Sequence, residues 1–464
     1  MMKNTTENTI KSEIIAAIEA FNREAATSSV SGIKIADWRL VETVTTREER
    51  YFVHEAMEQA RSVDATSYSL SVYVDSEAEG KKFRGEATVS VQPGSGPDEI
   101  ADKLKRAAFA ASKSKNPWFA LPGPAAPKVP LSPSGFEGMT DAARVSVARE
   151  ALFAPESGNV AGAVNASAAR INSLELFLAH ERMNFQNSRG AAFSARSWHG
   201  YAEFVLEAPA ADGPVELFDD IAFSDPDAGR LSSATRTRLE QVRDRAIATP
   251  LCALENVPVI LRGKEAEDVF GWFFSCAATS EVFIKTSSFE LGKNVQRSRE
   301  DEIVADPFDL WAEPALQGIP ESTAFDPDGF PLERTLVIDQ GVLKSLVGSV
   351  RYADWLGQPR AGNFQLFSVS PGRSSLAEMH AGPYLEPVMF SDFRLDPVTG
   401  AFGAEIRLAY YFDGKKRIPV TGGSISGAVP ELRAGMLRSV ERAIVSRSLC
   451  PVAIKLTGVT ISGT

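Results

Sequence analysis

A proline-rich stretch early in the sequence limits the secondary structure that this part of the chain can form. Residues 116–135, NPWFALPGPAAPKVPLSPSG, contain six prolines. Proline fixes φ, lacks a backbone N–H, and disfavours a helical conformation in the residue before it. The stretch can therefore be neither a helix nor a central strand. We predict a semi-rigid segment that crosses between two parts of the protein.

A chain of 464 residues is too long for one ordinary hydrophobic core, so several domains are expected. We predict an N-terminal α+β section at 1–115, the crossing segment at 116–135, a middle section with a strand pair and a helix at 136–250, and a β-rich domain at 251–464. The expected fold class is α+β, in which a mixed strand and helix domain precedes a largely antiparallel C-terminal domain.

The composition excludes several classes of protein. The chain has 49 basic and 60 acidic residues and a net charge of −11, which argues against direct binding to nucleic acid or to an anionic membrane. Three distant cysteines form no disulfide framework, and the N-terminus lacks the apolar core of a signal peptide. No stretch approaches the ~18 apolar residues of a membrane span. We predict a cytoplasmic protein.

Apolar periodicity predicts the main elements. An opening helix carries Ile10, Ile14, Ile15, Ile18 and Phe21 on one face. Turns at 326–329 and 339–341 border a short β run at 335–338, which is a hairpin pattern. The other expected elements are strands at 67–76, 86–92, 257–261 and 451–463, two long strands around a turn at 187–190, and helices from Pro97 and at 235–248, 264–280 and about 430–447.

Few side chains are placed for chemistry. The four histidines are His54, His180, His199 and His380, and no two of them lie at metal-ligand spacing. The sequence at His54-Glu55 begins like a zinc-binding helix, but Glu58 stands where the second histidine would be. We therefore interpret His54 as an ordinary residue on a helix surface.

The glycine-rich stretch TGGSISG at 421–427 resembles a phosphate loop or a nucleophile elbow. It has no following lysine for the first, and its glycine spacing does not fit the second. A turn beside a sheet is the simpler interpretation, and Gly422 and Gly423 would then let a peptide backbone approach closely. The cysteines are interpreted as core residues. An independent hydrolase that uses Ser424 or Cys276 is a further alternative.

The helix predicted at 264–280 has a wide apolar face and an acidic start, which suits a helix N-terminus. From its residues alone, it is a core helix behind a sheet. The apolar residues are Val269, Phe270, Phe273, Phe274, Ala277 and Ala278, and the charged ones are Lys264, Glu265, Glu267 and Asp268.

The order of these segments resembles the TldD/PmbA family, described as modulators of DNA gyrase and as TldD/TldE peptidases. The segments that carry the resemblance are the strand 257–261, the helix 264–280, SSFELGKNV at 287–295, VADPFDL at 304–310, the hairpin region 325–357 and AGN at 361–363. KKFRGEATVSV, NSRG and the stretch 398–427 are also similar to the family. The resemblance spans about residues 60 to 464.

The metal-bearing TldD branch of that family carries His-Glu-x-x-x-His on this helix, and a later cysteine completes the zinc site. By resemblance, Gly271 stands at the first histidine, Trp272 at the glutamate and Cys276 at the second histidine. Cys276 alone cannot hold zinc, and the carboxylate that would act as general base is missing. The chain therefore resembles the TldE/PmbA branch, which lacks the metal site and pairs with a TldD-type subunit.

The resemblance implies a non-catalytic subunit of a cytoplasmic TldD/TldE-type metallopeptidase complex. Such a complex degrades or matures unfolded or modified peptides, with zinc on the TldD-like partner and no cofactor in this chain. The alternative is a stand-alone homodimeric regulatory or peptide-binding protein of the gyrase-modulator type, without peptidase activity.

The region 325–363 is predicted to border the peptide cavity, because it combines turns with polar groups beside strands. Arg334 would engage a peptide carbonyl or carboxylate. Alternatively, Arg334 pairs with Asp326 or Asp328 and stabilises the turn. The candidate cavity residues are Asp326, Asp328, Arg334, Asn363, Gly422 and Gly423.

Overall fold

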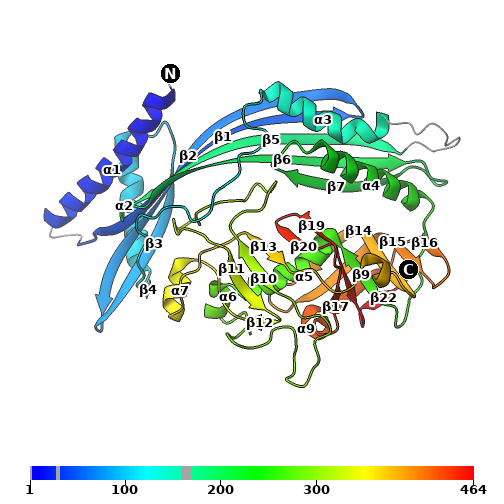
Figure 1. The fold of residues 1–464 in the computed structure, drawn as a ribbon. Coiled ribbons are helices and arrows are strands. Elements are labelled where there is room, and N and C mark those ends of the chain that lie inside the picture. Colours follow the sequence, from blue (N-terminus) through cyan, green and yellow to red (C-terminus); the bar gives the residue numbers. More distant parts are fainter. Residues whose placement is uncertain (1–2, 28–31, 158–168) are drawn as a thin grey trace.

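The structure is a computed structural model that describes residues 3–27, 32–157 and 169–464. Within these residues it has an α+β fold with three β-sheets (Figure 1). Most neighbouring strands in the C-terminal half run antiparallel, although the pairs β13–β20, β9–β14 and β8–β16 are parallel. The predicted fold class is confirmed.

A seven-stranded sheet arches over the C-terminal half of the molecule (Figure 1). Its strand order is β4-β3-β2-β1-β5-β6-β7, so the sequence segments on both sides of the proline-rich stretch contribute to one sheet. The strands are β1 (Ile35–Val53), β2 (Ala56–Ala78), β3 (Lys81–Val91), β4 (Asn116–Pro117), β5 (Arg170–Asn187), β6 (Ala192–Ala208) and β7 (Val215–Phe223).

Helices cover the sheet at one end and on its outer face (Figure 1). At the end lie α1 (Lys3–Thr27) and α2 (Pro97–Lys113), and Ile10, Ile14 and Ile18 of α1 are buried there, as the apolar spacing predicted. On the outer face, α3 (Asp141–Ser157) and α4 (Ala228–Ala246) pack on the apolar side chains of β5, β6 and β7.

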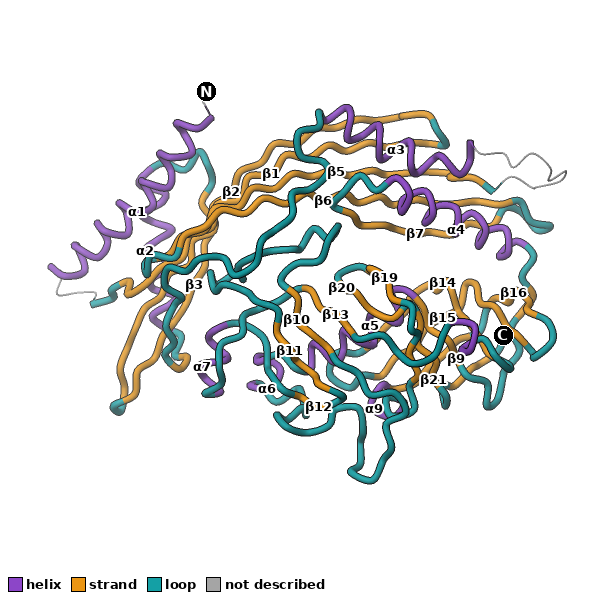
Figure 2. The backbone as a smooth tube through the Cα atoms, in the orientation of Figure 1, coloured by secondary structure: helices purple, strands orange, loops and turns teal. Residues whose placement is uncertain are grey.

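The C-terminal half contains a nine-stranded and a six-stranded sheet, and most of their strands are short and joined by loops (Figure 2). The helix α5 (Gly263–Cys276) lies in a core formed with both sheets. The nine-stranded sheet has β8 (Thr249–Pro250), β9 (Val259–Arg262), β14 (Tyr384–Leu395), β15 (Ala401–Phe412), β16 (Arg417–Thr421), β17 (Ser424–Ala428), β18 (Leu437–Arg438), β21 (Ala453–Leu456) and β22 (Thr460–Ser462).

The six-stranded sheet has β10 (Leu310–Glu313), β11 (Thr335–Asp339), β12 (Val342–Leu343), β13 (Leu366–Val369), β19 (Arg442–Val445) and β20 (Ser448–Pro451). The hairpin predicted around 339–341 is β11–β12. Short helices complete this half of the molecule: α6 (Thr279–Phe283), α7 (Val350–Leu356), α8 (Leu376–Met379) and α9 (Val429–Leu432).

The proline-rich segment lies between the arched sheet and the C-terminal half. Its carbonyl groups accept hydrogen bonds from both sides. Trp355 donates to Pro117 (2.8 Å), Arg360 donates to Ala120 (3.0 Å), and the Asn187 amide donates to Pro122 (2.9 Å). A segment that is poor in backbone donors thus uses its free acceptors to join two layers.

The prediction of a helix at about 430–447 is wrong. Only α9 is helical there, and the chain continues as β18 and β19. Two tertiary constraints override the helical periodicity. The Arg438 side chain is buried (1% exposed), and its guanidinium donates to the Asp306 carboxylate at 2.9 Å. In addition, β19 pairs along its whole length with β20.

The helical interpretation of His54 is also wrong. His54 has a φ of 52° and lies in the tight turn that joins β1 to β2. The sequence patterns predicted no strand at 35–66, where β1 and the start of β2 form. These strands mix charged and apolar side chains on one face, so a simple alternation of apolar and polar residues is absent.

The aromatic residues of α5 give a first prediction. Phe273 is fully buried and lies 5.1 Å from Phe308, measured between ring centroids. Phe273→Ala should lower the free energy of unfolding by about 3–5 kcal/mol, since it leaves a cavity in the shared core. Phe218→Ala is the matched control, because that ring is 55% exposed. Equal melting temperatures for the two variants would contradict the assignment of Phe273 to the core.

Candidate functional site

The turn at 325–331 holds two of the predicted cavity residues in a buried cluster. Asp326 is 0% exposed. One carboxylate oxygen accepts from the backbone N–H groups of Asp328 (2.9 Å) and Phe330 (2.8 Å), and the other accepts from the N–H of Asn363 (3.1 Å). Asp326 therefore fixes its own turn to the chain at 363, while the Asn363 side chain is exposed.

The same turn docks on the inner face of the arched sheet. The Asp328 carboxylate accepts from Arg39 of β1 at 2.8 Å and from the Ser349 hydroxyl at 2.6 Å. Beside it, the ring of Phe325 stacks on Phe193 of β6 with the ring centroids 4.4 Å apart. Sequence reasoning missed Arg39, since nothing in the sequence connects β1 with a turn almost 300 residues later.

Arg334 lies apart from this cluster. Its Nε donates to the Glu313 carboxylate at 2.8 Å, and its guanidinium carbon lies 4.5 Å from the centroid of the Trp311 ring. The alternative in which Arg334 pairs with Asp326 or Asp328 is therefore wrong. The Arg334 side chain is 55% exposed, so its remaining donors are open to a ligand.

Gly422 and Gly423 join β16 to β17 and both have positive φ values, 76° and 70°. A Cβ added to Gly422 would lie 2.3 Å from Cγ2 of Thr464, and one added to Gly423 would lie 2.2 Å from the carbonyl oxygen of Ser462. The close backbone approach expected at these glycines is made in this structure by the chain's own C-terminal segment.

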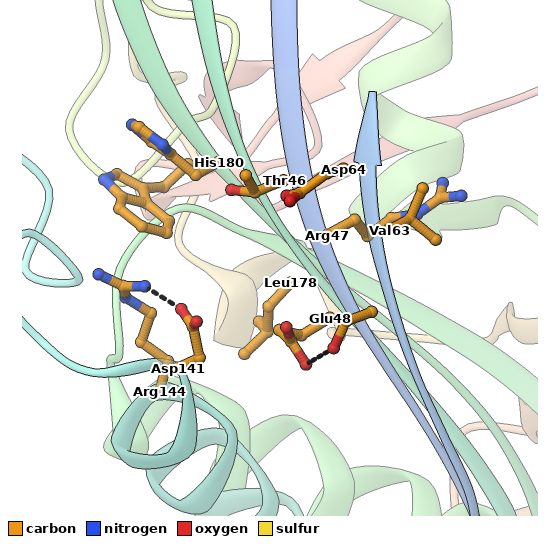
Figure 3. Close-up of a pocket in the computed structure, with 11 residues that line it drawn as sticks. Thr46, Arg47, Glu48, Val63, Asp64, Asp141, Arg144, Leu178 and His180 are labelled. Atoms are coloured by element: carbon orange, nitrogen blue, oxygen red, sulfur yellow. Dashed lines mark hydrogen bonds and ion pairs between the residues drawn. The ribbon is translucent and has the colours of Figure 1, made fainter. Parts of the chain in front are cut away.

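A polar pocket of about 470 Å³ lies under the start of α3. Figure 3 shows Thr46, Glu48 and His180 from the sheet beside Asp141 and Arg144 of α3. Both His180 and the Arg144 guanidinium lie on the Trp198 ring, at 4.3 Å and 4.0 Å from its centroid. Burial and nearby arginines lower the pKa of His180, so its imidazole is neutral at neutral pH. The protein's own groups thus occupy the aromatic surface that a ligand would use.

Residues 254–463 match the PmbA/TldA metallopeptidase C-terminal domain. This C-terminal domain belongs to the TldD/PmbA family. The resemblance inferred from segment order is confirmed by this domain.

Solved structures share the fold of the whole chain. TldE from Thermococcus kodakarensis is 15% identical with a TM-score of 0.74, and the match covers 96% of this chain and 100% of that one. A proposed modulator of DNA gyrase from Thermotoga maritima is 16% identical with a TM-score of 0.71, covering 96% and 99%. Among relatives compared by sequence, an uncharacterised protein of Methanocaldococcus jannaschii is 24% identical over 159 residues, which are 30% of this chain and 38% of that protein.

Helix α5 of this TldD/PmbA-type domain does not fit the zinc that the resemblance implies for the metal-bearing branch. Gly271 offers no side chain, and a Cβ built on it would meet no atom within 4 Å. Trp272 and Cys276 are each 5% exposed, and burial raises the pKa of the Cys276 thiol to about 12. A thiol that stays protonated is a poor metal ligand.

The remaining acids of α5 do not replace the missing ligands. Burial raises the pKa of Glu265 and of Glu267 to about 7, and it also raises the pKa of Asp268. One carboxylate oxygen of Glu267 is used by the backbone N–H of Arg447 at 3.2 Å. Within residues 3–27, 32–157 and 169–464, no group of three or more His, Cys, Asp or Glu side chains is arranged to hold a metal ion.

The buried carboxyl group of Asp326 generates a prediction about pH. Burial, with a smaller contribution from Asp328, raises its pKa from 3.8 to about 7. Between these two pKa values, the folded protein therefore keeps on Asp326 a proton that the unfolded chain has released. The stabilisation is fully present below about pH 4 and is lost as the pH rises through 7.

Urea unfolding of the wild-type protein and of Asp326→Asn at pH 5, 6, 7 and 8 measures this effect. The wild-type free energy of unfolding, relative to the variant, should fall with rising pH by up to about 1.4 kcal/mol per unit below pH 7 and then level off. Parallel curves over the whole range would show that Asp326 does not titrate in this way.

Proposed function

We propose that this chain is a metal-free, non-catalytic subunit of a TldD/TldE-type metallopeptidase complex. One observation carries the proposal: the chain combines a PmbA/TldA metallopeptidase C-terminal domain with an α5 helix that has no zinc ligand set. Gly271, Trp272 and Cys276 supply one buried thiol between them, whereas a catalytic zinc site needs about three protein ligands. The chemistry would then reside on a TldD-like partner that binds zinc.

The proposed substrates are unfolded, modified or precursor peptides, and the proposed location is the cytoplasm. Among the described residues, no helix has the length and apolar character needed to span a membrane.

The chain's part would be to hold an extended peptide against its sheets, where backbone hydrogen bonds give affinity with little selectivity. The proposed cavity residues remain Asp326, Asp328, Arg334, Asn363, Gly422 and Gly423, of which Arg334 and Asn363 present exposed side chains.

A homodimeric regulator without peptidase activity is the second candidate. Two of the solved structures that share the fold, from Thermotoga maritima and Bacteroides thetaiotaomicron, are described as proposed modulators of DNA gyrase. A net charge of −11 disfavours direct contact with DNA but permits contact with an enzyme that acts on DNA.

Purification of the tagged chain from its native host tests the proposal. We expect it to recover a homologue that carries His-Glu-x-x-x-His, and peptide hydrolysis that needs both chains and stops on chelation. The isolated chain should contain no stoichiometric zinc by elemental analysis and should cleave no peptide. A chain that hydrolyses peptides alone, with about one bound zinc, would overturn the proposal. Recovery of a homodimer without a peptidase would favour the regulator.

Arg334→Ala tests the cavity role within the reconstituted complex. If Arg334 donates to a peptide carbonyl or carboxylate, peptide cleavage at limiting substrate should fall about tenfold, the effect of one charge-assisted hydrogen bond. The melting temperature should stay unchanged, because the side chain is 55% exposed. Lys344→Ala is the matched control, since Lys344 is also half exposed and paired, with Asp339 at 3.5 Å. Equal cleavage by both variants would remove Arg334 from the cavity.

A further inference from the structure

The inner face of the arched sheet carries an unusual cross-strand row of carboxylates. In the pairing register, Glu175 of β5 lies directly opposite Glu203 of β6, and Glu203 lies directly opposite Asp220 of β7. Neighbouring strands are about 4.8 Å apart, and like charges placed directly opposite each other destabilise a sheet. Three acids in succession therefore cost stability unless something else in the protein or a ligand compensates them.

The protein compensates this row only in part. Within the described residues, neither Glu175 nor Glu203 lies within ion-pair distance of a lysine or arginine, and the Tyr201 hydroxyl donates to Glu203 at 2.9 Å. Lys264, at the start of α5, interacts electrostatically with Asp220. Glu49 in the next row already pairs with Arg47 at 2.8 Å. The uncompensated charge is thus centred on Glu175 and Glu203.

Aromatic rings line the row on the same face. Tyr51 pairs with Glu175 across β1 and β5, and Phe177 pairs with Tyr201 across β5 and β6. The ring centroids of Tyr51 and Phe177 are 6.0 Å apart, and those of Phe177 and Tyr201 are 6.2 Å apart. All three rings are partly exposed and belong to no buried core cluster. On the edge strand, Phe218 extends this face and is 55% exposed.

This face is turned toward the C-terminal half (Figure 1). One end of it is used for docking, because Phe185 and Phe193 stack beneath the turn at 325–331. The acidic row and its rings lie on the same face of the same strands, farther along them, where their side chains remain accessible. The docked turn and the acidic row therefore have different tasks.

We propose that this face binds an extended peptide through a positively charged side chain, arginine or lysine, placed between the Glu175–Glu203 carboxylates and the Tyr51–Phe177–Tyr201 rings. Carboxylates match the donors of an arginine or lysine, and aromatic faces attract the same cation. The charge of the row decides in favour of a cationic peptide over an anionic or neutral one. This inference rests on the proposed function, and it names the class of peptide that the subunit recognises.

Three fluorescein-labelled peptides of equal length and of Gly, Ser and Thr background provide the test, with two central positions occupied by Arg, Gln or Glu. Binding to the full-length chain is followed by fluorescence anisotropy at low and at physiological salt. The Arg peptide should bind at least tenfold more tightly than the Gln peptide, and the difference should shrink as salt is added. The Glu peptide should bind most weakly.

Glu175→Gln/Glu203→Gln should weaken binding of the Arg peptide about tenfold or more and leave binding of the Gln peptide unchanged. The melting temperature of this double variant should be equal or higher, because like charges have been removed from the row. Glu150→Gln/Glu240→Gln is the matched control, as it removes the same charge from α3 and α4 on the outer face.

The outcomes separate the two proposals. Equal binding of all three peptides overturns the cationic preference and leaves the peptide-binding subunit standing. Equal weakening by both double variants also overturns it, since net charge alone would then explain the preference. Binding of none of the peptides overturns the peptide-binding role itself, and the inference with it.

Discussion

The arrangement of the two halves depends on the contact between the turn at 325–331 and the inner face of the arched sheet. Arg39 on β1 binds the Asp328 carboxylate, and that side chain is held in place because Asp326 ties its turn to the chain at Asn363. A charge-assisted hydrogen bond in a mostly buried setting is costly to break, since the partner is left without compensation. Stacking of Phe325 on Phe193 adds apolar area at the same place. The sheet is therefore fixed at one end while its inner face farther along stays accessible.

A second buried network fixes the crossing segment to the same sheet. Arg84 of β3 is 0% exposed and donates to Asp37, to Asp75 and to the carbonyl of Phe119. This arginine joins two strands and the proline-rich segment through one planar group whose donors point in fixed directions. The segment has few backbone donors, so its position is fixed by the hydrogen bonds that its carbonyl groups accept. A sheet and a loop held together in this way suit a protein that shapes a binding surface.

Local chemistry in the sequence predicted the elements whose own residues determine them. The helix expected from Pro97 forms as α2, with Ile100, Leu104 and Ala108 buried on one face, and the turns around β11 indicated its hairpin. The failures share another cause. The segment at 430–447 has helical periodicity, but a buried arginine and strand pairing hold it extended. His54 lies in a turn between two strands that mix charged and apolar side chains on one face. Contacts between residues hundreds of positions apart, such as Arg39 with Asp328, leave no local signal.

The acidic row likewise leaves no local signal in the sequence. Glu175 and Glu203 lie in separate stretches, each with ordinary neighbours, and only the pairing register of β5 with β6 places them opposite each other. Register is set by the apolar residues of the other face, Leu174, Leu176 and Phe204, which α3 and α4 cover. The outer face thus determines which charges meet on the inner face. A sheet whose outer face secures stability can keep an unfavourable set of charges on its inner face, where a ligand compensates them.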